Sequence, residues 1–107
     1  MEENAFNAPP SKRKKKVDLI ALQSPLKRIP GMDIATVRDL IDIGVQHVDD
    51  LRGRAPEALL EEILNMREQT PPERLHYIRM AVYYAETDNP DPHMLQAWKW
   101  ADSSFLG

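Results

Sequence analysis

The sequence of 107 residues contains no cysteine. This excludes disulfide bonds, thiol catalysis and thiolate metal sites, and it makes a reducing cytoplasm the expected location. No long apolar run is present, so we expect no transmembrane helix, and the basic N-terminal residues lack the apolar stretch of a secretory signal. With only four glycines, the chain also lacks a phosphate loop and a Gly-rich nucleotide fingerprint. We expect no membrane association and no bound cofactor.

Catalytic and metal-binding constellations are missing as well. The three histidines, His47, His76 and His93, do not have the spacing of metal ligands. The adjacent carboxylates Asp49-Asp50 and Glu61-Glu62 would point about 100° apart on a helix, so neither pair converges as a general acid and base must. The sequence therefore predicts that the protein is not an enzyme and holds no metal.

Charge is unevenly distributed along the chain. Residues 1–16 carry five basic and two acidic side chains, whereas residues 17–107 carry nine basic and fifteen acidic ones, giving net charges of +3 and −6. Asparagine, proline, serine and lysine dominate residues 1–16, which predicts a disordered basic tail before a folded domain over residues 17–103. Lys14, Lys15 and Lys16 in the tail are candidates for phosphate contacts, and a purely solubilising role is the alternative.

Helical periodicity fills the first half of the folded part. An apolar stripe begins at Leu19 and continues to Ile29, where Pro30-Gly31 ends it. Asp33 is a good N-cap for the next helix, and Gly44 ends that helix with a positive φ. No stretch alternates with period two for long enough to predict a strand.

Further helices follow in the second half. A short helical turn over residues 48–51 precedes a helix with Pro56 at its first position. Thr70 and Glu73 predict a capping box for a fifth helix, and Asp91 predicts the cap of a final one. The apolar residues expected to face the core from the helix that begins at Pro56 are Leu59, Leu60, Ile63, Leu64 and Met66. We expect a compact all-α domain of five to six helices.

The segment from Leu26 to Asp33 has the pattern apolar-x-x-apolar-Pro-Gly-apolar-x, followed by a helix. Gly31 permits a tight reversal, and its missing Cβ lets a partner approach the backbone. Amides at the start of the next helix then point outward, where the helix dipole favours an anion such as a phosphate. The candidate nucleic-acid-binding residues of this region are Lys27, Arg28, Pro30, Gly31, Met32, Asp33 and Arg38. A plain turn between two helices, with Met32 filling the core, is the alternative.

The same region resembles the helix-hairpin-helix domains of DNA repair and replication proteins. The residues that carry this resemblance are Ile29-Pro30-Gly31, Ile43-Gly44-Val45 and Val48-Asp49-Asp50-Leu51, within residues 26 to about 60. The resemblance implies a SAM-domain-like fold of the DNA-repair helix-hairpin-helix type.

A more particular resemblance lies downstream. The run Arg79-Met80-Ala81-Val82-Tyr83-Tyr84-Ala85-Glu86, then Asn89-Pro90-Asp91-Pro92, then Trp98-Lys99-Trp100, resembles the small bacterial "pathogenicity locus" helix-hairpin-helix family. This resemblance spans about residues 22–102. It implies a stand-alone module of DNA-binding type and brings no particular biochemical activity with it.

The chain departs from the general hairpin pattern at two positions. Asp33 stands where a second hairpin glycine is usual, and Val37 stands where a small residue is usual. The carboxylate of Asp33 would cap the N–H groups that a phosphate needs and would repel the phosphate. We therefore expect phosphate binding to be weakened, and Lys27, Arg28 and Arg38 can outweigh the single negative charge.

Aromatic residues near the C-terminus form a second candidate site. Positions 98 and 100 cannot both face inward on one helix, so we expect at least one tryptophan to be partly exposed. Met94, Trp98 and Trp100, with Phe105, are the candidate surface for a partner. The alternative is that Trp98 closes the core against a tyrosine of the preceding helix.

Two functions remain open at this level. The first is a module that binds DNA without sequence specificity, because nothing here resembles a recognition helix for the major groove. The second is a protein-interaction module that uses the same fold as a scaffold. The hairpin resemblance and the basic tail favour DNA, whereas the acidic domain and Asp33 favour a protein partner.

Overall fold

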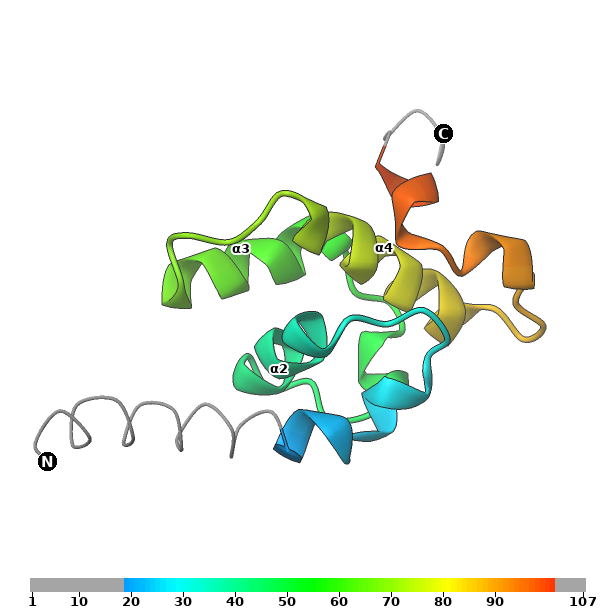
Figure 1. Ribbon diagram of the computed structural model, residues 1–107, viewed down its shortest axis with the longest axis horizontal. Coiled ribbons are helices and arrows are strands. Elements are labelled where there is room, and N and C mark those ends of the chain that lie inside the picture. The colour runs from blue at the N-terminus through cyan, green and yellow to red at the C-terminus, as the bar shows by residue number, and fades with distance from the viewer. Residues whose placement is uncertain (1–18, 102–107) are drawn as a thin grey trace, which may run out of the picture.

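The computed structural model describes residues 19–101, which contain no strand. The all-α prediction is therefore confirmed for this part of the chain. The complete elements in chain order are η1 (Pro25–Arg28), α2 (Ile34–Asp42), η2 (Val48–Leu51), α3 (Pro56–Met66), α4 (Glu73–Glu86), η3 (Pro92–Met94) and η4 (Ala97–Trp100), where η denotes a 3-10 helix (Figure 1). Residues 19–22 are also helical. The predicted tail with Lys14, Lys15 and Lys16 lies outside the described residues, as does Phe105.

Several local signals act as the sequence predicts. Asp33 is the N-cap of α2, and its carboxylate accepts the Thr36 amide at 3.2 Å. Gly44 follows α2 with φ of +97°, and Pro56 is the first residue of α3. These signals depend on neighbouring residues alone, which explains why they are readable without the fold.

The predicted capping box at the start of α4 is wrong. The Thr70 hydroxyl donates to the carbonyl of Arg67 at 2.9 Å, so it closes the end of α3 instead. Helix α4 begins after Pro72, with no side-chain cap.

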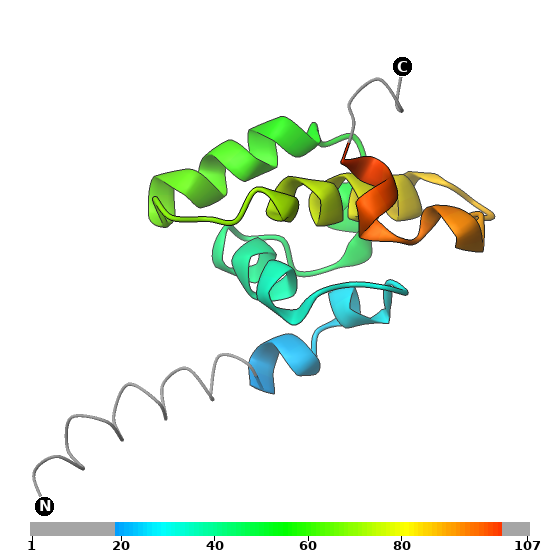
Figure 2. The same ribbon diagram turned by 45° about the horizontal axis from the view of Figure 1, so that its top comes forward.

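Helix α4 is the central element of the domain. It packs against α2, α3, η2 and η4, and Figure 2 shows it between α3 and α2. Its buried residues lie on more than one face: Arg74, Ile78, Arg79, Met80, Ala81, Val82 and Ala85. Because neighbours surround α4, its sequence shows a weaker apolar stripe than a surface helix would.

The predicted final helix is instead two 3-10 turns. Asp91 does act as a cap, accepting the His93 amide at 3.0 Å, but the chain leaves helical geometry between η3 and η4, where Gln96 is extended. The Trp100 indole donates to the carbonyl of Met94 at 2.8 Å, which ties η4 back to η3. The described residues thus hold three complete α-helices and part of another, fewer than the five to six expected.

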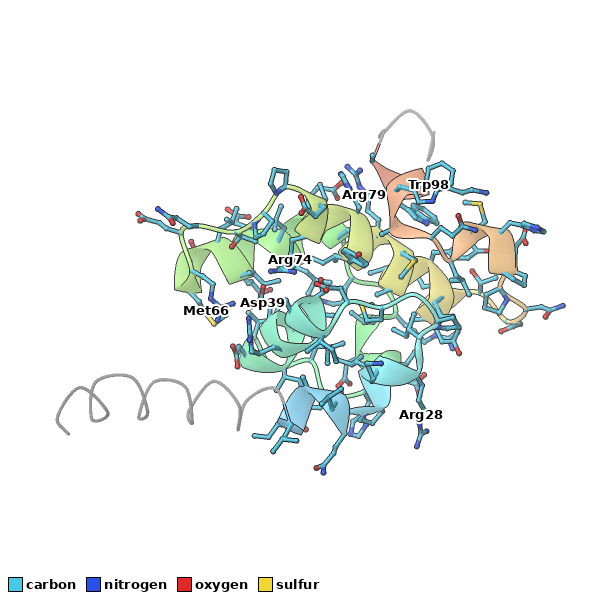
Figure 3. The ribbon with its side chains drawn as sticks, in the orientation of Figure 1. Arg28, Asp39, Met66, Arg74, Arg79 and Trp98 are labelled. Atoms are coloured by element: carbon cyan, nitrogen blue, oxygen red, sulfur yellow. The ribbon has the colours of Figure 1, made fainter. Side chains whose placement is uncertain are left out.

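The core is apolar and continuous across these elements. Its fully buried large side chains include Leu26, Ile29, Val37, Leu40, Val45, Leu51, Leu59, Ile63, Ile78 and Met80. The expectation that Leu64 and Met66 face inward is wrong, because their exposed fractions are 39% and 46%. Figure 3 shows Met66 at the outer end of α3. Leu19, Ile20 and Leu22 are about half exposed, and only Ala21 of that stretch is buried.

None of the helices within residues 19–101 combines the length and the hydrophobicity needed to span a lipid bilayer.

Candidate nucleic-acid interface

The turn between η1 and α2 is built around Gly31. Its φ of +77° is in the left-handed region, which L side chains rarely adopt. The Met32 amide closes the turn on the carbonyl of Ile29 at 3.2 Å, and Met32 is buried. Pro30 and Gly31 are exposed. The turn therefore presents backbone to solvent and anchors itself in the core through Met32.

The space beside Gly31 is already taken by this chain. A Cβ on Gly31 would lie 2.6 Å from the carbonyl oxygen of Leu95. The close approach that the glycine permits is thus partly an internal contact with the connection between η3 and η4.

Asp33 occupies the N-terminus of α2 in the way its sequence predicts. Its Oδ2 accepts the amide and the hydroxyl of Thr36, each at 3.2 Å. The same oxygen accepts a hydrogen bond from Arg74 Nη1 at 3.0 Å. A carboxylate therefore already satisfies part of the anion-binding capacity of this helix end.

Behind Asp33 lies a buried ionic network that the sequence analysis did not identify. Asp39 on α2 is fully buried, and Arg74 Nε lies 2.8 Å from its Oδ2 at an angle that does not satisfy a hydrogen bond. Arg67 contacts the other oxygen of Asp39 and lies 3.4 Å from Asp42. Figure 3 shows Arg74 and Asp39 pointing toward each other between α4 and α2. The network ties α2 to α4 and to the α3–α4 connection.

The helical pattern of the sequence does not reveal this network. At about 100° per residue, Asp39 falls on the face of the helix opposite Val37 and Ile41, where a charged side chain is expected in solvent. The identity of the partners depends on residues about thirty positions away, and that information is not local.

The three basic residues predicted to contact phosphates near the Gly31 turn have different surroundings. Arg28 is exposed and Lys27 is half-buried, and neither forms a salt bridge with another residue of 19–101. Figure 3 shows Arg28 pointing away from Asp39 and Arg74. Burial lowers the pKa of Arg67, and the nearby charges of Arg38 and Arg74 lower it further. Arg38 thus lies close to the ionic network, whereas Arg28 does not.

The tryptophans divide between surface and core. Trp98 is 68% exposed, whereas Trp100 is 4% exposed. Trp100 packs against Tyr83 with ring centroids 5.3 Å apart, and Arg79 Nη1 donates to its carbonyl at 2.6 Å. Trp100 is therefore not part of a partner surface, and it is Trp100 rather than Trp98 that closes the core. Met94 is half-buried beside it.

Titratable side chains of residues 19–101 form no group of three or more His, Asp or Glu that could hold a metal ion. Backbone hydrogen bonds from Gln46 and His47 lower the pKa of Asp50, and a backbone and a side-chain hydrogen bond from His93 lower the pKa of Asp91. Both carboxylates are capping groups, so these shifts reflect local structure.

Comparison with known proteins identifies one family. No curated protein and no solved structure shows significant similarity to the chain. The pathogenicity locus family, Cdd1, matches residues 20–104, which include all of the described residues except Leu19. The chain therefore belongs to the pathogenicity locus family.

Proposed function

We propose that this protein binds the phosphate backbone of DNA without sequence specificity, through a helix-hairpin-helix element formed by η1, the turn at Gly31 and α2. The observation that carries the proposal is that Lys27 and Arg28, unpaired with any acidic residue of 19–101, flank an exposed backbone turn. Basic side chains and free amides are the groups that hold phosphates. We infer that the protein binds DNA without catalysing a reaction and without recognising the base sequence.

Backbone amides at the turn support the proposal. The amides of Gly31, Asp33, Ile34 and Ala35 have no backbone or side-chain acceptor within residues 19–101. They precede or begin a helix of nine residues, where N–H groups carry a partial positive charge. A strand that passes the turn would find these donors in the segment that follows Lys27 and Arg28 in the chain.

Two features make the proposed binding weak. The described residues carry nine basic and thirteen acidic side chains, so their overall charge repels a polyanion. Asp33 places a carboxylate over the α2 N-terminus. Affinity should therefore be high only at low ionic strength, where few ions compete for the phosphates.

The test is fluorescence anisotropy of a labelled DNA duplex titrated with the full chain over a range of salt concentrations. We expect the Lys27→Gln/Arg28→Gln variant to bind more weakly and to have a smaller salt slope, by about 0.9 per lost phosphate contact. The control is Arg52→Gln/Arg54→Gln, which also removes two positive charges, on either side of Gly53, although Arg54 is paired with Glu62 at 3.0 Å. Equal losses in the two variants would mean that the hairpin is not the site.

The basic tail needs its own variant because it is a candidate for the same phosphates. In Lys14→Gln/Lys15→Gln/Lys16→Gln, we expect a smaller salt slope but continued sensitivity to Lys27→Gln/Arg28→Gln. If binding depends on the tail alone, the hairpin proposal fails.

A substitution of Asp33 should raise the DNA affinity rather than lower it. Asp33→Gly removes the carboxylate from the α2 N-terminus and leaves the amides for a phosphate, so DNA affinity should rise. The cap and the Arg74 ion pair are lost, so the free energy of unfolding should fall by about 1 kcal/mol. Unchanged or lower affinity in a folded Asp33→Gly protein would contradict phosphate binding at this helix end.

A protein-interaction function is the second candidate, and a different observation favours it. Leu19, Ile20 and Leu22 are about half exposed. An open groove of about 360 Å³ is lined by Ile20, Gln23, Ser24, Pro25, Ile41, Gln46 and His47. If this surface binds a protein, Ile20→Asp should abolish a binary interaction with a purified partner, whereas Leu64→Asp, also at an exposed apolar position, should leave it intact.

A further inference from the structure

Trp98 is the most exposed large hydrophobic side chain of residues 19–101, and its position is fixed by polar neighbours. Its indole Nε1 donates to Gln96 Oε1 at 2.9 Å. The Lys99 ammonium lies over its ring, 5.5 Å from the centroid. The ring is thus oriented before any ligand arrives, while 68% of its surface remains in solvent.

The segment that carries Trp98 touches the hairpin turn. The carbonyl of Leu95, three residues before Trp98, lies where a Gly31 side chain would begin. Figures 1 and 2 both show the turn that precedes α2 beside the η3–η4 segment. Figure 3 shows Trp98 and Arg28 at opposite edges of the molecule, so a strand that contacts both would run along the contact between the Gly31 turn and the η3–η4 connection.

The surroundings of Trp98 distinguish between classes of ligand. The other large exposed apolar residues lie on other elements, and Figure 3 shows Met66 at the opposite end of the molecule from Trp98. Gln96 and Ala101 beside it are exposed, and Lys99 is charged. A protein hot spot needs a surrounding apolar surface that excludes water, whereas a single aromatic ring with a cation is sufficient to stack one base and attract its phosphate.

We infer that Trp98, with Lys99, is a stacking platform for an unpaired base of DNA whose backbone is held at the hairpin. The inference rests on the proposed function and narrows its substrate to DNA with a single-stranded end or a junction between duplex and single strand. A base inside a blunt duplex is stacked on its neighbours and is not available to the ring.

The experiment compares two labelled probes, a blunt duplex and the same duplex with a short thymine overhang, titrated with the full-length protein at low salt. We expect the overhang probe to bind more tightly. Trp98→Ala should reduce its affinity roughly ten-fold or more and leave the blunt duplex unaffected. Trp98→Phe keeps a ring and should retain most of the affinity, and circular dichroism checks that both variants are folded.

Tryptophan fluorescence gives a second readout, because a Trp98 with a purely structural role would not be quenched by DNA. Stacking on thymine should quench the exposed Trp98, so the overhang probe should quench emission of the unmodified protein but not of Trp98→Phe, which still binds. Equal affinity of both probes, or an unchanged overhang affinity in Trp98→Ala, would overturn the inference and leave the hairpin proposal standing. If Lys27→Gln/Arg28→Gln leaves binding of both probes unchanged, the hairpin proposal fails instead.

Discussion

Gly31 and Gly53 share a φ of +77° but have different surroundings. At Gly53 nothing lies within 4 Å of where a Cβ would be, whereas at Gly31 the Leu95 carbonyl oxygen would be 2.6 Å away. Gly53 is therefore needed for backbone conformation alone. Gly31 is needed both for conformation and for the contact between its turn and the η3–η4 connection.

Substitutions of Gly53 and Gly31 separate the cost of the backbone conformation from the cost of the contact with Leu95. Gly53→Ala should lower the free energy of unfolding by about 1–2 kcal/mol, the cost of an L side chain in the left-handed region. Gly31→Ala should cost about 1–3 kcal/mol more, because the backbone must shift away from Leu95. Urea denaturation measures both values. Equal losses of unfolding free energy would show that the Leu95 carbonyl can move away from a side chain at position 31 without a cost in stability.

A carboxylate in η2 has a predictable response to acid. The amides of Gln46 and His47 donate to Asp50 at 3.1 and 3.0 Å and hold its pKa below the ordinary value of 3.8. The stabilisation by Asp50 should be fully present above pH 3.8 and should be lost as the pH falls through the lower pKa of the folded state. A carboxyl titration followed by NMR measures this pKa, and a value at or above 3.8 would contradict the capping role.

At the scale of elements, α2 and α4 are joined by charge as well as by the apolar core. Asp39 is fully buried, and the side chain of Arg74 is 8% exposed. Two buried ions must each lose most of their water, and their attraction offsets this desolvation cost only while they face one another. Arg67 and Asp33 at the edges of the network complete the pairing.

Breaking this pairing at its buried end should be costly. Asp39→Ala leaves the buried Arg74 without its main counterion, so the free energy of unfolding should fall by about 3–5 kcal/mol. Asp42→Ala removes a partner of Arg67 that is 37% exposed, which should cost less than about 1 kcal/mol. Similar costs for the two variants in urea denaturation would show that water reaches Asp39.

At the scale of the whole molecule, α4 joins the other two complete α-helices to the 3-10 turns η2 and η4. It packs against α2, α3, η2 and η4, and the last of these contacts runs through Trp100. The Trp100 ring lies on Tyr83, and its carbonyl accepts from Arg79, which also lies 3.3 Å from Glu57 on α3. The C-terminal turns are therefore part of the cooperative structure.

The two tryptophans should differ sharply in their effect on stability. Trp100→Ala removes a buried aromatic side chain and should cost about 3–5 kcal/mol, a large part of the stability of a small domain. Trp98→Ala changes an exposed side chain and should stay within about 0.5 kcal/mol of the original protein. Unfolding followed by circular dichroism measures both, and a small cost for Trp100→Ala would mean that η4 unfolds separately.

Features that depend on neighbouring residues could be predicted without the fold. These include the all-α class, the Asp33 cap, the end of α2 at Gly44, the start of α3 at Pro56 and the membership of the family. Each of them follows from a cap, a backbone preference or a short motif, and none requires knowledge of what packs nearby.

Which distant groups meet depends on how the elements pack. The packing places Trp100 inside and Trp98 outside, and it brings Arg74 to Asp33 and Asp39. It also set the Leu95 carbonyl against Gly31. Gly31 and Leu95, the most distant of these pairs, are 64 residues apart in the sequence. Periodicity along the chain does not predict such pairs, because burial and ion pairing depend on the packing of all elements together.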